Sequence, residues 1–387
     1  MGGLTPHSLN PTKGGYRQVM EEMGMTLASN LKRILKYFLV RIIIMAITLL
    51  IGVYVVILVA NMGGAVDEIR KSEIREAVGR RLLGDENYRI MSSEERQKYA
   101  KMLEEIEFKR FGLDQPFLIR SFLYLKQALT LDLGNAERLT SDTGSRKVKL
   151  IILERLVPTL VLMMTSFLIL FFSALTFALF LSRRYGSFFD KMIIALAPLS
   201  AAPAWFYGIF LILIFAAILK ILPFGGMVRV PPPDNAFEYF LSLLRHLVLP
   251  VFSVLLSSIF ISTYNWRTYF LIYSNEDYVE MAKAKGLSSA MIERRYILRP
   301  TMPAIVTSFA LSLITQWMGS ITLETVFNWP GLGRRIYEAI SNFDSPVIVG
   351  ANVIYAYLLA TTVLVLDVIY AILDPRVRVE ATGGVEQ

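Results

Sequence analysis

The residues that could do chemistry in this sequence are few, and none of them forms a recognised catalytic or metal-binding pattern. The chain has no cysteine and only two histidines, which excludes disulfides and thiolate metal sites. His246 has no second histidine or acidic residue at metal-ligand spacing. No phosphate-binding G-x-x-x-x-G-K-[ST], nucleophile elbow or H-E-x-x-H motif occurs. We therefore expect no catalytic, cofactor-binding or metal-binding residue, and no hydrolysis of ATP by this chain.

The most distinctive polar stretch is EDYVEMAKAKGLSSAMIERRYILRPTMP at 276–303, a charged segment between two long apolar runs. Residues 277–285 are good helix formers with acids first and lysines last, which suits the helix dipole. Gly286 then fits a left-handed C-cap. A second short helix can begin at Ser288 or Ser289 and is expected to end at Pro300. The segment is thus predicted to fold as helix, glycine turn and helix.

A compact knob of this kind could seat in a groove of another protein and transmit a push to the apolar runs on either side. Ala282 and Ala284 would keep its outer surface small. Arg294 or Arg295 could pair with acidic residues of that partner. For the segment taken alone, an amphipathic loop resting on lipid headgroups is an equal alternative.

A second group of residues could gate or line a path through a membrane. The stretch ETVFNWPGLG at 324–333 predicts a rigid outer or re-entrant turn, with an ordinary surface turn as the alternative. The prolines in APLSAAPAWF at 197–206 predict a kink that either opens a cavity wall or packs against small neighbours. Asp367 lies near the end of an apolar run and should face protein or water, in a structural hydrogen bond or a transport path. The gate or path candidates are Pro203, Trp205, Glu324, Phe327, Trp329 and Asp367.

The elements that position these residues must be membrane-spanning helices. Of the 387 residues, 54% are hydrophobic and 19% are charged, which is too apolar for an ordinary soluble domain. Six apolar runs reach the roughly 20 residues that a span needs, and they are too long for barrel strands. The predicted spans are 34–60, 156–181, 192–222, 247–272, 304–323 and 347–373.

Basic residues beside the apolar runs predict the orientation of these spans. By the positive-inside tendency, the flanks that carry them face the cytoplasm together with the segment 276–300 and both ends of the chain. The formal net charge of +8 is explained by this topology, and no basic stripe with stacking aromatics suggests a nucleic-acid partner. The flanking basic residues are Lys32, Arg33, Lys36, Arg183, Arg184, Lys191, Arg376 and Arg378.

This topology divides the chain into five parts, one of which is a large outer segment. In that segment, Ser92 followed by Glu95 predicts a capping box at the start of a helix. Phe117, Phe122, Leu125 and Leu129 predict a second amphipathic helix, with a solvated spacer as the alternative reading. The predicted parts are a cytoplasmic tail at 1–33, a first span at 34–60, an extracellular helical insertion at 61–150, a five-helix core at 151–373 and a cytoplasmic tail at 374–387.

The spacing Glu280, Met281, Ala282, three residues, Gly286 resembles the E-A-A-x3-G loop of ABC importer permeases, the coupling helix that docks on an ATPase subunit. Met281 and the loop ending ILRPTMP depart from that pattern. From about Ser92 onward, an ordered set of blocks is similar to the dipeptide and oligopeptide permease family. The blocks are FGLDQPF, LTLDLG, RLVPTLVL, HLVLP, ETVFNWPGLGRRIYEAI and DVIYAILDPRVR.

The resemblance implies an all-α polytopic membrane protein with six transmembrane helices, a type I ABC importer permease core and a helical extracellular insertion between helices 1 and 2. It implies a permease subunit that moves dipeptides or oligopeptides across the cytoplasmic membrane, with ATP and magnesium bound by partner ATPases. The implied partners are a second homologous permease subunit, two ABC ATPase subunits, an extracellular substrate-binding protein and membrane lipid. The implied ATPase-docking residues are Asp277, Tyr278, Glu280, Ala282, Ala284, Gly286, Leu287 and Arg294.

Three alternatives stay open at the level of sequence. Members of the same importer family carry oligosaccharides or nickel complexes. A secondary transporter or channel without ATPases would show inverted repeats or paired intramembrane charges, and beyond Asp367 few candidates occur. A receptor-like module that signals inward would rest only on the size of the outer segment.

Overall fold

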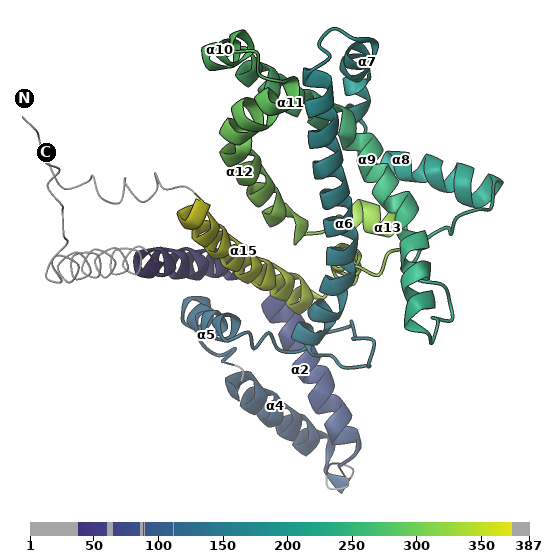
Figure 1. The fold of residues 1–387 in the computed structure, drawn as a ribbon. Helices are drawn as coiled ribbons and strands as arrows, with labels where there is room; N and C mark the ends of the chain where they lie inside the picture. The colour runs from purple at the N-terminus through teal and green to yellow at the C-terminus, as the bar shows by residue number, and fades with distance from the viewer. Residues whose placement is uncertain (1–37, 60–64, 86–87, 89, 111, 374–387) are drawn as a thin grey trace, which may run out of the picture. The chain divides into compact units, whose positions relative to one another are not determined.

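The computed structural model describes residues 38–59, 65–85, 88, 90–110 and 112–373. Over these residues the chain is helical, apart from loops and one isolated bridge between Asn135 and Lys147 (Figure 1). This confirms the predicted all-α class. The predicted tails at 1–33 and 374–387 lie outside the described residues. The chain forms two compact units, one of residues 1–49 and 367–387 and one of residues 50–366.

Five helices in the described part are long and apolar enough to cross a membrane, and a bent helix pair makes a sixth if it is one span. The chain is therefore a multi-pass membrane protein, as the apolar runs predict. Several helices extend beyond the predicted runs; Asn235, for example, caps α9 (Ala236–Ser274) by accepting the Phe237 N–H at 2.8 Å. The five are Phe38–Val59, α6 (Val148–Ser182), α9, the stretch Ser289–Gln316, and Ser345–Asp367 within α15 (Ser345–Leu373).

The predicted third span, 192–222, is not one straight helix. Residues Phe188–Ala201, comprising α7 (Phe188–Leu196) and the 3₁₀ turn η1 (Ala197–Ala201), meet Ala204–Ile218 at an angle of 95°. The second arm comprises α8 (Ala204–Leu211) and the π-helical η2 (Ile212–Ile218). The break falls at Ala202 and Pro203, both extended, because proline lacks an N–H and disfavours a helical conformation of the residue before it. The predicted kink is confirmed, and it is sharp enough to separate two helices.

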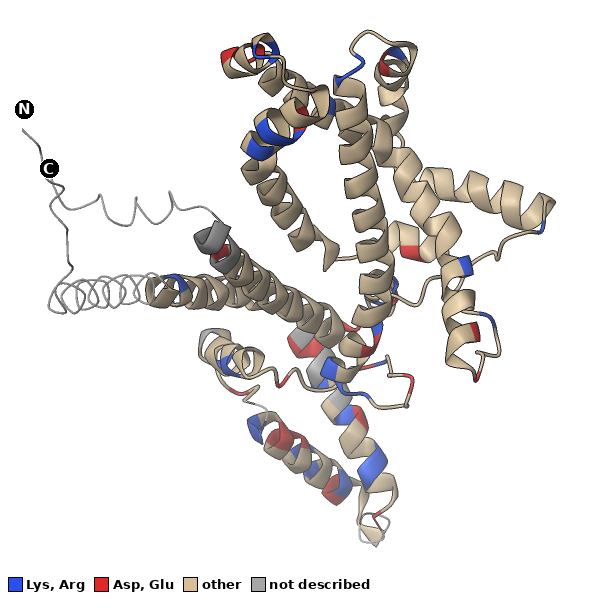
Figure 2. Cartoon of the chain, viewed as in Figure 1, with Lys and Arg blue, Asp and Glu red and all other residues tan. Residues whose placement is uncertain are grey.

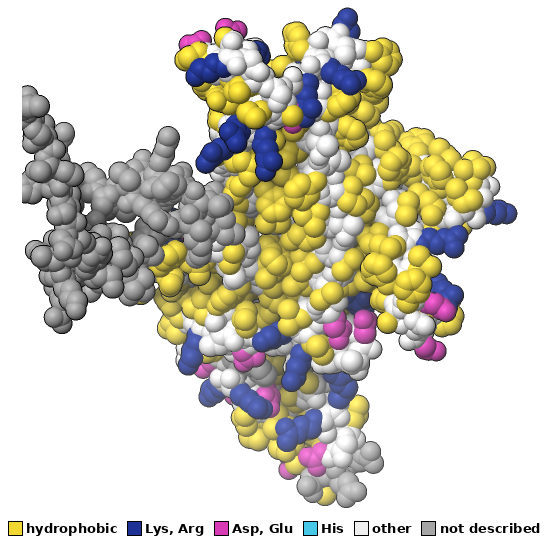
Figure 3. Space-filling model, viewed as in Figure 1, with side chains coloured by type: hydrophobic (Ala, Val, Ile, Leu, Met, Phe, Trp, Pro, Cys, Tyr) yellow, Lys and Arg dark blue, Asp and Glu magenta, His cyan; other side chains and the backbone are white. Residues whose placement is uncertain are grey.

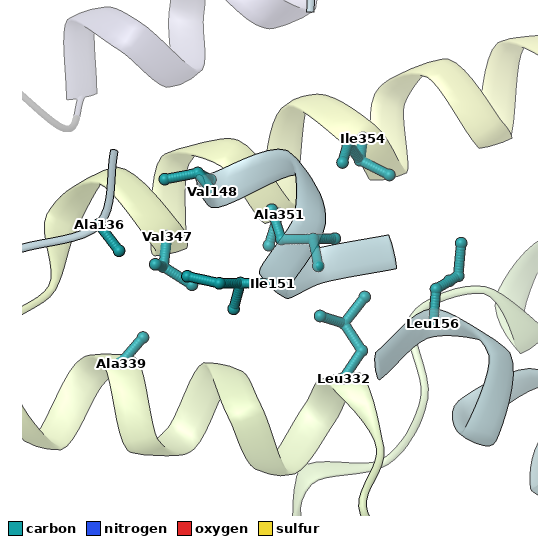
Figure 4. Close-up of a cluster of buried hydrophobic side chains, with 10 residues drawn as sticks. Ala136, Val148, Ile151, Leu156, Leu332, Ala339, Val347, Ala351 and Ile354 are labelled. Atoms are coloured by element: carbon teal, nitrogen blue, oxygen red, sulfur yellow. The ribbon is translucent and has the colours of Figure 1, made fainter. Parts of the chain in front are cut away.

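A buried apolar cluster joins α6 to α14 (Leu332–Ser341) and α15. Figure 4 shows Val148 and Ile151 of α6 facing Val347 and Ala351 of α15, with Leu332 and Ala339 of α14 below them. Gly350 permits the close approach, since a Cβ there would lie 2.5 Å from the Cγ1 of Val148. This cluster fixes the core around the segment 320–345.

In the described part of the segment 61–150, which is predicted to lie outside, are the helices α2 (Ala65–Leu83), α4 (Ser93–Arg110) and α5 (Phe117–Leu129). The capping box is confirmed, because the Ser92 N–H donates to Glu95 Oε2 at 2.9 Å and the Glu95 N–H donates to Ser92 Oγ at 3.4 Å. The amphipathic α5 is confirmed, whereas α2 was not predicted from the sequence. Arg120 of α5 donates two hydrogen bonds, of 2.8 and 2.5 Å, to the carboxylate of Asp67, and they raise the pKa of Arg120.

A buried acid ties the end of the outer segment to the core. Asp344, directly before α15, is fully buried and accepts the backbone N–H groups of Glu137, Arg138 and Leu139 at 3.1, 2.9 and 2.8 Å. Three such donors satisfy a carboxylate that would otherwise be costly to bury. These three hydrogen bonds thus connect the end of the insertion to the start of the last span.

Charges gather at the ends of the unit formed by residues 50–366. Figure 2 shows Lys, Arg, Asp and Glu concentrated on α2 and α4 and again around α10, while the helices between them are almost free of charge. Figure 3 shows hydrophobic side chains covering the surface between these ends. This distribution is the one expected of a protein whose middle lies in lipid.

Candidate functional site

The knob, residues 276–300, folds as the sequence predicts in its first half. α10 (Asp277–Ala284) is followed by Gly286 in the left-handed region, with φ of 76°. The Gly286 N–H donates to Lys283 O at 2.9 Å and the Leu287 N–H donates to Ala282 O at 3.3 Å, which closes the helix end. The predicted glycine C-cap is confirmed.

The knob has an exposed outer face and a buried inner face. Asp277, Glu280, Ala284 and Gly286 are exposed, and the exposed fraction of Met281 is 61%. Val279 is fully buried. Ala282 is only 2% exposed, so the expectation that it makes the outer surface small is wrong: at this spacing it shares the inner face with Val279, and only Ala284 remains outside.

The second half of the knob departs from prediction at Pro300. The chain continues from α11 (Ser289–Ile292) through the π-helical η3 (Glu293–Leu298) into α12 (Arg299–Gln316) without ending. Pro300 lies in the first turn of α12, where the absent N–H costs little after the wide π turn. The knob is therefore continuous with the fourth long span, and Arg294 is exposed on η3.

A cavity of about 540 Å³ opens between α6, α9 and α12. Its lining carries hydroxyl, amide and aromatic groups and contains no charged side chain. A second hollow of about 480 Å³ lies along α12 and shares Ser308, Ser312 and Thr315 with the first. Residues that line the larger cavity are Phe167, Leu170, Phe171, Ala174, Ser262, Asn265, Trp266, Tyr269, Ala304, Ser308, Ser312, Thr315 and Gln316.

Sequence reasoning named none of the cavity residues as a path candidate. The available signal was the spacing of Ser308, Ser312 and Thr315, which puts three hydroxyls on one face of a largely apolar helix. Polar side chains on one face of a span are expected to face protein or water rather than lipid. This polar stripe makes the cavity a candidate path for a polar solute.

The three path candidates of the stretch 324–333 lie inside the protein. Glu324 of α13 (Ile321–Val326) is fully buried, and it accepts hydrogen bonds from Thr159 Oγ1 at 2.8 Å and from the Arg334 N–H at 2.9 Å. Burial raises the pKa of Glu324, and these hydrogen bonds offset part of that effect. Glycines at 319, 331 and 333 let the backbone close around the carboxylate. Glu324 is therefore the centre of a polar cluster that fixes the turn.

Phe327 and Trp329 reinforce the same turn. Trp329 is fully buried and its Nε1–H donates to Pro158 O of α6 at 2.9 Å. Phe327 is 1% exposed and packs over Gly208 of α8, where a Cβ would lie 2.8 Å from the ring. The predicted non-helical turn is found only at 327–331, because 324–326 belong to α13 and 332–333 belong to α14. Neither Phe327 nor Trp329 lines the large cavity.

Two further path candidates stand apart from the cavity. Pro203 begins α8 at the break, and Trp205 is 38% exposed beyond it; neither lines the large cavity.

In the other compact unit, Asp367 forms an ion pair with Arg41 of the helix Phe38–Val59, and Arg41 Nη2 donates to Asp367 Oδ1 at 3.2 Å. The structure thus places Asp367 in a structural pair, and a role for it in a path stays a prediction.

The fold and the site together define a multi-pass membrane component of a transport system: long apolar helices, an uncharged cavity between them that is lined by aromatic, hydroxyl and amide side chains, and an exposed polar knob at one end. The family "Binding-protein-dependent transport system inner membrane component" matches residues 149–379. The chain belongs to this family.

Relatives carry names that agree with this class. A putative peptide permease protein of Brucella suis biovar 1 is 31% identical over 70% of this chain and 82% of its own length. An oligopeptide transport system permease protein of Bacillus subtilis is 28% identical over 70% and 83%. A glutathione transport system permease protein of Salmonella choleraesuis is 31% identical over 70% and 82%.

Proposed function

We propose that this chain is the permease subunit of an ATP-driven importer that carries dipeptides or oligopeptides across the cytoplasmic membrane. Relatives are named for peptide, oligopeptide and glutathione transport, which are all peptide-like solutes. Amide and hydroxyl side chains of the cavity suit hydrogen bonding to peptide groups, and the absence of charge in its lining suits peptides of any side-chain charge.

One observation carries the coupling part of the proposal: the two helices that flank the knob are also walls of the cavity. α9 leads directly into α10, and η3 leads directly into α12. Asn265 and Tyr269 of α9 and Ser308 and Ser312 of α12 line the cavity. A push on the exposed face of α10 therefore acts on both walls, which is the link that an importer needs between ATP hydrolysis and its pathway.

The partners follow from this arrangement. Two separate ABC ATPase subunits bind ATP and magnesium, and the exposed residues of the knob dock on one of them. A second, homologous permease subunit completes the pathway, and an extracellular binding protein delivers the solute at the end that carries α2, α4 and α5. With the knob in the cytoplasm, both termini are cytoplasmic.

The test is purification of the full chain from its native membrane in mild detergent, with co-purifying subunits identified by mass spectrometry. We expect two ATPase chains, a second permease and peptide uptake that requires ATP after reconstitution. Glu280→Arg in the exposed face of α10 should release the ATPases. Glu94→Arg, an equal charge change at an exposed position in α4, should not.

Three other outcomes would overturn or change the proposal. A chain that purifies alone and still takes up peptide without ATP is a secondary transporter, and the proposal fails. Release of the ATPases by Glu94→Arg but not by Glu280→Arg would move the docking face away from the knob. Uptake of nickel complexes or oligosaccharides but not of peptides would keep the importer and change its solute.

A further inference from the structure

The short connection between α6 and α7, residues 183–190, contacts both limbs of the knob. We use the term limb for α9, through which the chain enters the knob, and for η3, through which the chain leaves it. These residues, which we call the α6–α7 turn, include the first residues of α7. They are distant in sequence from residues 276–300, yet each end of the turn forms an ion pair with a different limb. The role inferred here rests on the proposed function, because it concerns how a push on the knob spreads through the protein.

The first ion pair holds the limb that enters the knob. Arg267 of α9 pairs with Asp190 of the turn through two contacts, one of them a hydrogen bond from Nη2 to Oδ2 of 2.6 Å. The exposed fractions are 5% for Arg267 and 1% for Asp190, so this ion pair is buried. Asp190 Oδ2 also accepts the Gly186 N–H at 2.8 Å, and Arg267 lies over the Tyr185 ring at 5.2 Å. A bidentate pair with further donors fixes both distance and angle.

The second ion pair holds the limb that leaves the knob. Arg183, the C-cap residue of α6, pairs with Glu293 at the start of η3. Glu293 is 8% exposed, whereas the side chain of Arg183 is 52% exposed, so this ion pair lies at the protein surface.

Between the two pairs lies an apolar floor shared by the knob and α6. Val279 and Ala282 of α10 pack in one buried cluster with Ile292, with Phe270 of α9 and with Ala178 of α6. Close packing transmits displacement with little compression, because interiors have few voids. The floor resists approach of the knob and α6, and the two ion pairs resist their separation.

We propose that the α6–α7 turn clamps both limbs of the knob, so that α6, the inner end of α9, α10 and η3 move as one rigid body when a partner pushes on α10. Arg183 and Asp190 are positioning residues in this device. They touch no solute; they hold α6, a wall of the cavity, to the motion of the knob. Without them the buried cluster still resists approach of the knob and α6, but neither ion pair resists their separation.

The chain has no cysteine, so two introduced cysteines can carry spin labels without other changes. Phe188→Cys in the turn and Met281→Cys in α10 are suitable sites, since Phe188 is 75% and Met281 is 61% exposed. The measurement is the distribution of the label-to-label distance in the purified full chain. The clamp predicts a narrow distribution that Arg183→Glu broadens at least twofold and that Arg183→Glu with Glu293→Arg narrows again.

Arg184→Glu is the matched control, because it makes the same charge change at the next residue, whose guanidinium lies over the Phe180 ring at 4.5 Å. It should leave the width unchanged. Asp190→Asn tests the buried pair with a side chain of the same size and should also broaden the distribution. An equally narrow distribution in Arg183→Glu and in Asp190→Asn, both folded, overturns the clamp.

A second readout separates this inference from the proposed function. In the assembled transporter, Arg183→Glu should lower uptake per ATP hydrolysed about tenfold while hydrolysis continues. An unchanged ratio together with a broadened distribution would overturn the role in coupling and leave only a structural one. If no ATPase assembles with the parent chain, the proposed function fails, and the distance distributions still decide whether the clamp exists.

Discussion

Thr159 of α6 and Glu324 of α13 share a buried hydrogen bond of 2.8 Å, although 165 residues separate them. The same hydroxyl accepts the Leu332 N–H at 2.7 Å, so one threonine side chain serves both ends of the stretch 324–333. Trp329 adds a hydrogen bond to Pro158, the neighbour of Thr159. The turn is thereby anchored on α6, one of the helices that line the cavity.

Thr159→Val should therefore destabilise the protein. The variant keeps the shape of the side chain but leaves the Leu332 N–H without its acceptor and Glu324 Oε1 without the Thr159 hydroxyl that donates to it, and each loss costs about 1–3 kcal/mol. We expect a loss of about 2–4 kcal/mol in the free energy of unfolding, measured by thermal unfolding in detergent. Thr159→Ser keeps the hydroxyl and should lose less than about 1 kcal/mol. A loss in Thr159→Ser with none in Thr159→Val would show that the methyl group, and not the hydrogen bonds, matters.

Stability should fall as the pH rises through the titration of Glu324. Burial raises the pKa of Glu324 in the folded protein above the value of about 4.3 in the unfolded chain. Between these two values the folded state binds more protons than the unfolded state, so the free energy of unfolding decreases with pH. Glu324→Gln, which does not titrate, should lose this slope in thermal unfolding measured from pH 4 upward. A slope that is the same in both proteins would assign the pH dependence to other groups.

Gly331→Ala should disrupt the same turn for a steric reason. A Cβ at this position would lie 2.4 Å from both Cδ and Oε2 of Glu324, so the carboxylate must move out of its hydrogen bonds. We expect a loss of about 2 kcal/mol or more, as for other broken buried networks. Gly52→Ala is the control, since a Cβ there meets nothing within 4 Å. A tolerated Gly331→Ala would mean that the turn can relax around the carboxylate.

Filling the cavity should block transport without unfolding the protein. Ser312 lines both hollows on α12, and a phenylalanine at this position would occupy much of the space and remove a hydroxyl. With proteoliposomes that contain the assembled transporter, we expect Ser312→Phe to lower peptide uptake more than tenfold, a cost of about 1.4 kcal/mol per factor of ten. Ser312→Ala removes only the hydroxyl and should retain most uptake. Full uptake by Ser312→Phe would place the pathway elsewhere.

The Arg41–Asp367 pair allows a direct choice between a structural and a transport role. Removing one partner of this partly buried ion pair leaves the other charge unpaired, so Arg41→Leu should destabilise the protein by about 1–3 kcal/mol. Replacing both residues by leucine should cost less than either single change. If Asp367→Asn instead leaves assembly and thermal stability intact and abolishes uptake, the acid belongs to the transport path.

The large outer segment shows where prediction from sequence stops. Ser92 and Glu95 interact over three residues, so their capping box is local and was predictable. α2 is rich in charges and buries only a narrow apolar face that includes Val78 and Leu82, and it was not predicted. Arg120 pairs with Asp67 of α2 from 53 residues away. A contact between residues so far apart produces no periodic pattern in the sequence from which it could be predicted.

The sequence by itself determined the membrane class, the number of apolar runs, the glycine end of α10 and the break at Pro203, because each depends on local composition, backbone restrictions or spacing. Only the tertiary structure decided that Ala282 faces inward, that Glu324 is a buried anchor and that Ser308 and Ser312 face a cavity. These properties depend on which helices meet. Helix contacts join residues far apart in the chain, so they follow from the packing of the whole unit and not from any one segment.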